Sequence, residues 1–312
     1  MTALLRKPRA LAAGDRLALV APASPFVEAD FHAGVRELEA LGFVPVWDER
    51  IFARRAYVAG EAELRAAAWT GAWKDPSIAG LLGVRGGYGS IHLLPHLDLA
   101  QLAEHPKVFV GYSDLTTLLT ALVCHAGVVA FHGPTVAGRL GGGQARYDRP
   151  SFVQVLTRAA AAGEIGGAGL EPLHPGDARG RLLGGTLSQL AAAAGTPWAL
   201  TPWDDTILLL EDVGERPYRL DRLIEQLRWS GAFQHVTGVV LGGFSGCDEP
   251  GGVPSARAVL ADRLGPLGVP VVFGLPTGHV DGPALTVPLG VQARLLSGPT
   301  CRLSIEEAAV VE

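Results

Sequence analysis

The chain has 312 residues, of which 48% are hydrophobic and 18% are charged, and its formal net charge at pH 7 is -5. This composition is typical of a globular protein, and the length allows two ordinary domains. The negative charge argues against a nucleic-acid-binding protein, which needs a basic face to neutralise phosphates. No segment approaches the roughly 20 consecutive apolar residues of a transmembrane helix, so we expect no membrane association.

The N-terminal segment and the cysteines both favour a cytoplasmic protein. Residues 1–15 include three basic side chains but no apolar run long enough for a signal peptide. The three cysteines are an odd number without metal-ligand spacing, and we expect each to be reduced and buried: Cys124, Cys247 and Cys301. No cluster of histidine, cysteine or carboxylate residues has ligand spacing either, so we predict no metal and no cofactor.

The first half of the chain alternates strand-like and helix-like segments. Strands are predicted over residues 16–21, 44–47, 78–84 and 107–110, and helices over residues 31–41, 61–74 and 115–125. This order predicts a layered, Rossmann-like α/β structure with a largely parallel sheet. Ligands of such sheets bind beyond the carboxyl ends of the strands. Two loops at such ends, residues 85–89 and 111–113, are therefore expected to lie near one another.

The second half has a different pattern. Residues 138–181 are rich in glycine and proline and resemble a connecting region, after which strands are predicted over residues 206–210, 236–241 and 269–275 and a helix over residues 217–229. Short strands from residue 284 onward predict an antiparallel element. We therefore expect an N-terminal α/β domain over residues 1–140 and a connecting region over residues 141–180. A smaller α+β domain with antiparallel or barrel-like strands is expected over residues 181–312.

Ser113 stands on a predicted strand-to-helix turn, in the sequence Gly-Tyr-Ser-Asp of residues 111–114. On such a turn the serine hydroxyl is exposed, and the helix N-terminus favours a developing oxyanion. The backbone N–H of Asp114 could donate to that oxyanion. However, the sequence does not match the Gly-x-Ser-x-Gly motif, and a serine that simply caps the helix is the alternative interpretation.

The glycine loop of residues 85–89, Arg-Gly-Gly-Tyr-Gly, follows a predicted strand. Consecutive glycines let the backbone approach a ligand closely and direct N–H groups at an anion, to which Arg85 would add charge. A tight turn that requires positive φ is the structural alternative, and a phosphate-binding loop is a third. The loop lacks the ending of a P-loop and matches a dinucleotide-binding loop only weakly.

Glu211 and His279 are the candidates for an acid–base pair. Glu211 directly follows an apolar strand, so its carboxylate is partly buried and needs a partner. A histidine N–H would satisfy it and fix the tautomer of the ring, whereas a salt bridge with Arg216 or Arg219 is the alternative. His279 lies in a loop shaped by glycines and prolines, where a ring can exchange protons with a substrate. Eight other histidines compete for this role.

Together these segments resemble the LD-carboxypeptidase family (S66-like), serine peptidases of the muramoyltetrapeptide carboxypeptidase and microcin-immunity type. The resemblance covers nearly the whole chain and depends on the number and order of its motifs rather than on any single one. They are VRGGYG at 84–89, GYSD at 111–114, FHGP at 131–134, GGTLSQL at 184–190, GTPW at 195–198, LLLEDVGERPYR at 208–219, GFSG at 243–246 and GHVDGPALTVPLG at 278–290.

The resemblance implies a role for each candidate residue. The nucleophile, the orienting acid and the base would be Ser113, Glu211 and His279, respectively. The oxyanion hole would consist of two backbone N–H groups, those of Gly87 and Asp114. Three residues of the glycine loop remain as candidates for substrate binding: Arg85, Gly86 and Tyr88. The family also implies an active site between an N-terminal α/β domain and a smaller C-terminal domain, and homodimers are common in it.

The reaction implied by the resemblance is hydrolysis of murein tetrapeptides, which releases the terminal D-alanine during peptidoglycan recycling. The expected partner is thus a small peptide substrate. A microcin-immunity-type peptidase, which cleaves peptidyl or aminoacyl nucleotides, would use the same triad. It would need an aromatic platform for adenine, and residues 138–181 contain only two aromatic residues, Tyr147 and Phe152, which favours the murein substrate.

Two further alternatives belong to other classes of protein. A non-catalytic peptide-binding protein predicts that at least one triad residue is replaced, and none is. A nucleotide-binding α/β protein would use the Gly86–Gly87 loop for phosphate, which leaves Glu211 and His279 unexplained.

Overall fold

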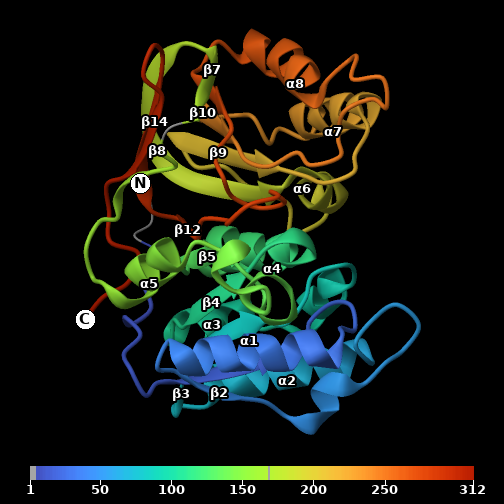
Figure 1. Cartoon of the computed structure of the whole chain (residues 1–312), viewed down its shortest axis with the longest axis vertical. Helices are drawn as coiled ribbons and strands as arrows, with labels where there is room; N and C mark the ends of the chain where they lie inside the picture. Colours follow the sequence, from blue (N-terminus) through green and yellow to red (C-terminus); the bar gives the residue numbers. More distant parts are fainter. Residues whose placement is uncertain (1–4, 168) are drawn as a thin grey trace.

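Two β-sheets, each flanked by helices, organise the chain (Figure 1). The computed structural model describes residues 5–167 and 169–312. The first sheet has six strands in the order β12-β5-β4-β3-β1-β2, and the second has eight in the order β6-β14-β13-β8-β9-β10-β11-β7. In the described part of the chain, no helix is both long and apolar enough to cross a membrane.

The first sheet is parallel except for one edge strand. Strands β1 to β5 run in the same direction, and β12 pairs antiparallel with β5. The strands are β1 (Arg16–Val20), β2 (Val44–Val46), β3 (Ile78–Gly83), β4 (Val108–Gly111), β5 (Ala130–His132) and β12 (Val287–Leu289). The helices of this part are α1 (Glu28–Ala40), α2 (Ala62–Lys74), α3 (Leu99–Glu104) and α4 (Thr116–Thr120). The predicted α/β layer is therefore confirmed.

The second sheet combines a parallel centre with antiparallel flanks. Strands β8 to β11 are parallel, whereas β13 and β14 on one side and β7 on the other are antiparallel. The strands are β6 (Gly163–Ile165), β7 (Glu171–His174), β8 (Gly176–Thr186), β9 (Thr206–Glu211), β10 (Val236–Leu241), β11 (Val271–Phe273), β13 (Gln292–Ser297) and β14 (Arg302–Ile305). The helices are α6 (Leu187–Ala193), α7 (Pro217–Trp229) and α8 (Ala256–Leu264). Of the short strands predicted from residue 284 onward, β13 and β14 form antiparallel pairs in this sheet as expected. The first of them, β12, instead joins the edge of the first sheet, where it pairs with β5.

The glycine-rich region of residues 138–181 is more ordered than its sequence indicates. It contains helix α5 (Arg149–Thr157), strands β6 and β7, and the first residues of β8. The short strands lie at the two edges of the second sheet. Glycine and proline are tolerated there because an edge strand has a neighbouring strand on one side only. The domain limits at residues 140 and 180 stay a prediction.

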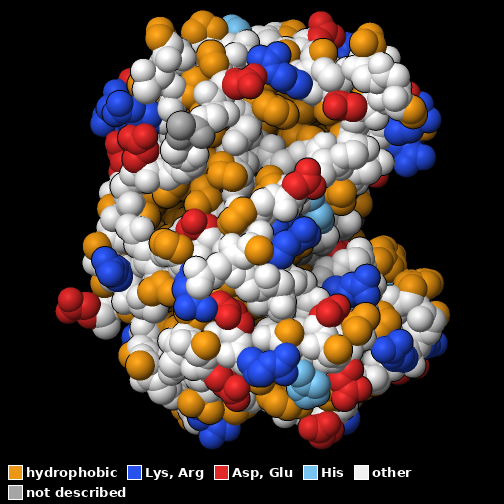
Figure 2. All heavy atoms as spheres, in the orientation of Figure 1, with side chains coloured by type: hydrophobic (Ala, Val, Ile, Leu, Met, Phe, Trp, Pro, Cys, Tyr) orange, Lys and Arg blue, Asp and Glu red, His pale blue; other side chains and the backbone are white. Residues whose placement is uncertain are grey.

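The two sheets meet where their central strands end. The N–H of Thr186, at the end of β8, donates a hydrogen bond of 3.1 Å to Thr116 Oγ1 at the start of α4. A side chain at Gly185 would lie 2.7 Å from the same oxygen, so glycine permits this close approach. The space-filling view shows the surface indented between the two lobes (Figure 2). The last residue of β9, Glu211, pairs with Thr186 and so lies at this junction as well.

The cysteines follow the expectation in part. All three are free, and Cys247 is buried, whereas Cys124 and Cys301 are only half-buried. Burial raises the pKa of the Cys247 thiol to about 11, which makes it an inert, protonated side chain near neutral pH.

Candidate active site

Ser113 occupies a strained turn between a strand and a helix. β4 ends at Gly111, and Ser113 begins a short 3-10 helix (Ser113–Leu115) that leads into α4. The φ angle of Ser113 is +63°, in the left-handed region that residues other than glycine rarely adopt. The residue in the capping position is Tyr112, and no side chain caps the helix. The capping interpretation of Ser113 is therefore wrong, and the strained serine is typical of an exposed nucleophile.

The glycine loop lies directly against this serine. A side-chain carbon at Gly86 would lie 2.8 Å from Ser113 Cβ and 3.0 Å from Ser113 Oγ, so only glycine fits there. Gly87 has a φ of +97°, which also requires glycine. Among the described residues, no protein acceptor binds the backbone N–H of Gly87 or Asp114. Both N–H groups are thus available to a ligand beside the serine hydroxyl.

Buried side chains hold the loop in this position. The carboxylate of Asp114 is 1% exposed and accepts hydrogen bonds from the backbone N–H groups of Gly89 (3.2 Å) and Ser90 (2.8 Å). Ser24 Oγ accepts the Tyr88 N–H at 3.1 Å and donates to Tyr57 O at 2.9 Å. The sequence singled out the N–H of Asp114 but not its side chain, and it did not single out Ser24.

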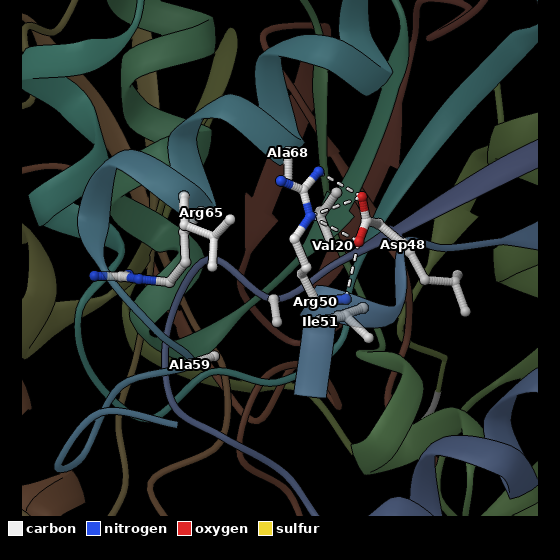
Figure 3. A pocket seen from close by; sticks show the side chains of 10 residues that line it. Val20, Asp48, Arg50, Ile51, Ala59, Arg65 and Ala68 are labelled. Atoms are coloured by element: carbon white, nitrogen blue, oxygen red, sulfur yellow. Dashed lines mark hydrogen bonds and ion pairs between the residues drawn. The ribbon is translucent and has the colours of Figure 1, made fainter. Parts of the chain in front are cut away.

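Arg65 of α2 binds the backbone at the end of the glycine loop and joins it to two neighbouring segments. It is 5% exposed, and its guanidinium donates to the carbonyl oxygens of Gly89 (2.8 Å), Gly60 (3.0 Å) and Pro22. Arg65 also borders a small cavity of about 30 Å³ beside β1, but its guanidinium points away from the Asp48–Arg50 ion pair on the other side (Figure 3). The role of Arg65 is therefore to fix backbone rather than to bind a ligand in that cavity.

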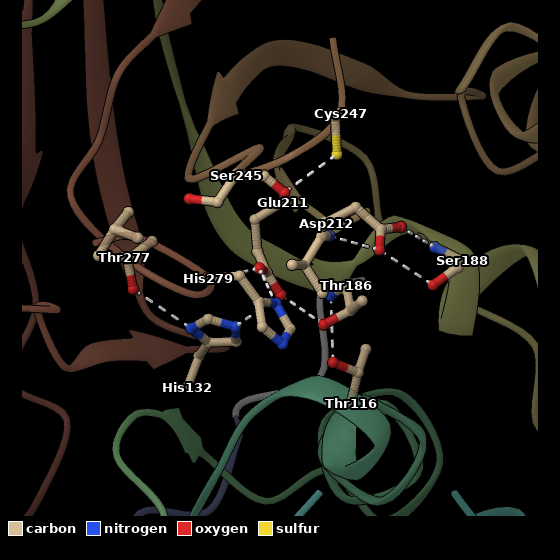
Figure 4. A network of polar contacts seen from close by, with 12 residues as sticks. Thr116, His132, Thr186, Ser188, Glu211, Asp212, Ser245, Cys247, Thr277 and His279 are labelled. Atoms are coloured by element: carbon tan, nitrogen blue, oxygen red, sulfur yellow. Dashed lines mark hydrogen bonds and ion pairs between the residues drawn. The ribbon is translucent and has the colours of Figure 1, made fainter. Parts of the chain in front are cut away.

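Glu211 and His279 form a hydrogen-bonded pair at the end of β9 (Figure 4). Glu211 is fully buried, and its Oε2 accepts from His279 Nδ1 at 2.7 Å and from the His279 backbone N–H at 2.9 Å. A side chain at Gly278 would collide with Glu211, so glycine lets the histidine loop approach. The carboxylate places the ring proton on Nδ1, which leaves Nε2 free to accept a proton.

The alternative partners of Glu211 are engaged elsewhere. Arg216 forms an ion pair with Glu249, and Arg219 Nη1 lies 3.6 Å from Glu215 Oε2. The salt-bridge interpretation of Glu211 is therefore wrong.

Two further side chains contact the other oxygen of Glu211. Thr186 Oγ1 donates a hydrogen bond to Oε1, and Nε2 of the buried His132 lies 3.6 Å from it. Burial raises the pKa of the Glu211 carboxyl, but the contacts and charges of His132 and His279 outweigh this effect and hold the pKa far below its ordinary value. Glu211 is therefore ionised near neutral pH.

The neighbouring carboxyl of Asp212 behaves in the opposite way. It is 2% exposed and accepts hydrogen bonds from the backbone N–H groups of Ser188 (2.7 Å) and Val213 (2.9 Å). Burial raises its pKa to about 6, although both hydrogen bonds lower it. Asp212 thus holds the first turn of α6 against the end of β9, next to the site.

Tyr112 and Arg139 connect the serine turn to the histidine loop. The rings of Tyr112 and His279 lie 5.0 Å apart, and the guanidinium of Arg139 lies 5.7 Å from the centre of the Tyr112 ring. Arg139, on the short helix η5 (Val136–Leu140), also donates to Val280 O at 2.6 Å and to Gly282 O at 3.0 Å. In the described part of the chain, no hydrogen bond joins Ser113 Oγ to His279, as is common in free enzymes.

The three candidates for substrate binding differ in their freedom. Gly86 faces Ser113, as described above. Tyr88 is 46% exposed and its ring lies 5.5 Å from that of Tyr57, which is 64% exposed. Arg85 is exposed, but its Nη1 donates to Pro25 O at 2.7 Å, so part of its guanidinium is used within the protein. Its role in binding a substrate carboxylate stays a prediction.

Comparisons with known proteins show which family the chain belongs to. Models of the LD-carboxypeptidase N-terminal and C-terminal domains match residues 17–133 and 179–295, respectively. A putative carboxypeptidase of Streptomyces coelicolor is 42% identical over 98% of each chain. The structure of muramoyltetrapeptide carboxypeptidase from Oxalobacter formigenes is similar with a TM-score of 0.81 and 31% identity, covering 94% of this chain and 99% of that one.

A second solved structure is similar over an equally long stretch. It is that of MccF in complex with glutamyl sulfamoyl guanosine, with a TM-score of 0.88 and 25% identity, covering 99% of this chain and all of that one. The chain therefore belongs to the LD-carboxypeptidase family, peptidase S66, and is a serine-type carboxypeptidase.

Proposed function

We propose that this carboxypeptidase hydrolyses murein tetrapeptides and releases their terminal D-alanine. One observation carries the proposal: the hydrogen-bonded Glu211–His279 pair at the end of β9 accompanies a strained serine at the end of β4. The similarity of the chain to a muramoyltetrapeptide carboxypeptidase supports the choice of substrate. The scissile amide of such a peptide joins the L-centre of diaminopimelate to D-alanine. Because D-alanine is the last residue, the substrate ends in a free carboxylate.

The proposed mechanism assigns one step to each group. His279 Nε2 takes the proton of Ser113 Oγ as this oxygen attacks the scissile carbonyl carbon. Glu211 stabilises the imidazolium that results, because its buried carboxylate already binds the Nδ1 side of the ring. His279 then gives the proton to the amine of D-alanine as the amide bond breaks. A water molecule, deprotonated by the same ring, hydrolyses the acyl-enzyme.

The oxyanion of the tetrahedral intermediate would be held by the backbone N–H groups of Gly87 and Asp114. Both lack a protein acceptor in the described residues, and the loop that carries Gly87 contacts Ser113 through Gly86, which supports this assignment. The loss of one such donor typically reduces kcat by about 100-fold to 1,000-fold. The hole is formed by backbone, so its donors survive side-chain substitution.

The direct test follows D-alanine release from L-Ala-γ-D-Glu-meso-diaminopimelyl-D-Ala. The purified protein should release D-alanine, and Ser113→Ala should retain at most a residual rate, because the nucleophile is missing. Circular dichroism spectra of the two proteins should coincide. A folded wild-type protein that releases no D-alanine would exclude the murein substrate.

A second substrate class, the aminoacyl nucleotides, is favoured by an exposed pair of aromatic rings, although the two aromatic residues considered in the sequence are not available. The two aromatic residues of the region 138–181, Tyr147 and Phe152, are fully buried and cannot stack on a base. The exposed pair of Tyr57 and Tyr88 beside the glycine loop could do so instead. MccF, a similar structure, contains an aminoacyl sulfamoyl nucleoside. Hydrolysis of a glutamyl sulfamoyl nucleoside by the wild type, lost in Tyr88→Ala, would identify this substrate class.

A further inference from the structure

His132 lies on the opposite side of the catalytic carboxylate from His279. It is the last residue of β5, is 0% exposed, and directs Nε2 at Glu211 Oε1 from 3.6 Å (Figure 4). At this distance the contact is electrostatic rather than a hydrogen bond. Among the described residues, no hydrogen-bond partner satisfies this buried nitrogen. A buried polar atom without a partner is costly unless the site uses it.

The neighbours of His132 determine which nitrogen carries a proton. Thr277 Oγ1 lies 3.3 Å from His132 Nδ1 and donates its single proton to Leu285 O at 2.9 Å. With this arrangement Nδ1 must donate its proton to Thr277, and the contact with Glu211 then decides whether Nε2 can be left as a bare lone pair. If the Thr277 hydroxyl donates its proton to Nδ1 instead, Nδ1 must be the unprotonated nitrogen, and a neutral ring then carries its proton on Nε2.

The remaining state, a neutral ring with its only proton on Nδ1, would direct the Nε2 lone pair at an ionised carboxylate. Such like-polarity contacts are unfavourable in a buried site. The other titratable groups that face His132 do not change this conclusion. These are Tyr112, whose ring lies 6.0 Å away, and His279, which binds the far oxygen of Glu211, while the charge of Arg139 lies over Tyr112.

We propose that His132 is a positioning residue, which holds Glu211 through an Nε2–H contact to Oε1 so that Oε2 stays directed at His279. The inference rests on the proposed roles of Ser113, Glu211 and His279. Oε2 accepts both His279 hydrogen bonds, so a rotation of the carboxylate would misalign the base. His132 and Thr186 are the side chains that restrain Oε1. Because His132 is 0% exposed, it would act through Glu211 rather than on the substrate.

Two substitutions separate this role from simple packing. In His132→Gln the amide nitrogen occupies about the place of Nε2 and keeps a donor toward Glu211, but the contact with Thr277 is lost. In His132→Asn the amide lies near the place of Nδ1, so the contact with Thr277 is kept and the donor toward Glu211 is lost. The positioning role predicts that Gln is active and Asn is impaired. A packing role through Thr277 predicts the reverse order.

The first measurement is the rate at which a fluorophosphonate probe labels Ser113, because this reaction needs the activated serine but not the physiological substrate. We expect His132→Asn to be labelled about 10-fold more slowly than the wild type, and His132→Gln within about threefold of it. On the tetrapeptide, the loss in His132→Asn should fall on kcat while KM stays within about twofold. Unfolding midpoints identify any variant that is merely unstable.

The outcomes are distinguishable from failure of the proposed function. A wild type that is not labelled at all would refute the serine mechanism itself. A wild type that is labelled but does not cleave the tetrapeptide would refute only the substrate, and the comparison of variants would remain valid. Equal labelling of all three proteins, or a faster reaction of His132→Asn than of His132→Gln, would overturn the positioning role of His132.

Discussion

Ser113 has a left-handed backbone conformation and packs directly against Gly86. The absence of a side chain at Gly86 is essential to this arrangement, since a carbon there would press on both Cβ and Oγ of the serine. A conformation of this kind typically costs about 1–3 kcal/mol and persists only where the surrounding structure enforces it. The strain therefore belongs to the function of the turn rather than to the stability of the fold.

We predict that Gly86→Ala reduces kcat/KM for D-alanine release by about 100-fold, because the new methyl group displaces the nucleophile by a fraction of an ångström to an ångström. Gly71→Ala is the matched control: it lies in α2 with no atom within 4 Å of the added carbon, so its activity should equal that of the wild type. Steady-state kinetics of the three proteins give the comparison. Full activity of Gly86→Ala would mean that the glycine loop does not touch the serine.

Local patterns selected Ser113, Glu211 and His279 as candidates because each follows a recognisable strand, but only the family resemblance assigned them roles. The structure brings Glu211 and His279 into contact. His132 was only one of the competing histidines, and Arg139 was not considered, because their contacts join segments far apart in the sequence. Arg139, for example, reaches a carbonyl 141 residues away. A sequence pattern carries no signal for such a contact.

At the scale of elements, the strand–helix alternation predicted most of the first sheet, since apolar periodicity is strong in buried strands and amphipathic helices. The edge strands β6 and β7 escaped prediction because their residues are half-exposed and interrupted by glycine and proline. The contacts that fix one element on another also escaped it. Asp212 makes one such contact, because its carboxylate, directly after β9, accepts a hydrogen bond from the Ser188 N–H in the first turn of α6.

Asp212 should make the stability of this β9–α6 contact depend on pH. Its folded-state pKa of about 6 lies above the ordinary value of 3.8, so between these pH values the folded protein binds the proton that the unfolded chain has lost. The contribution of Asp212 to the free energy of unfolding is thus complete below about pH 4 and is lost as the pH rises through 6. The change amounts to about 3 kcal/mol.

The neutral variant Asp212→Asn provides the reference for this prediction. We expect the free energy of unfolding of the wild type, relative to that of the variant, to fall from pH 4 to pH 7 by up to this amount. Urea unfolding of both proteins at several pH values measures the difference. Glu211, whose pKa is lowered in the folded protein, makes the free energy of unfolding rise with pH. This contribution is present in both proteins and cancels in the difference between them. Parallel pH curves would show that Asp212 is ionised at little cost in the fold.

At the scale of the whole molecule, the site depends on two sheets that meet at the ends of their central strands. The first sheet carries the serine and the glycine loop, and the second carries the carboxylate, while the histidine loop follows β11 and returns to the first sheet through β12. Sequence reasoning predicted that both halves contribute. It could not predict their register, which is set by contacts such as that between Thr116 and Thr186.

Arg139 is the side chain that spans this junction most directly. Its guanidinium donates to three carbonyl oxygens, two of them in the histidine loop, and its Cζ lies 5.7 Å from the centre of the ring of Tyr112, next to the serine. Lysine cannot reproduce this fork, because its ammonium group is a single point of donation. In Arg139→Lys we therefore expect the loop of residues 279–282 to loosen and kcat to fall about 10-fold or more, since His279, the proposed base, would no longer be held near Ser113.

Hydrogen exchange locates the effect of this change. Amide protection in Arg139→Lys should decrease around residues 279–282 and remain unchanged in the outer strands β2 and β14, which lie far from the junction in sheet order. The control is Arg149→Lys, which makes the same change at a half-buried arginine that pairs with Glu37 outside the site and should preserve kcat. A variant with normal exchange and normal kcat would mean that the two lobes hold the base in place without Arg139, through the contacts of Glu211 alone.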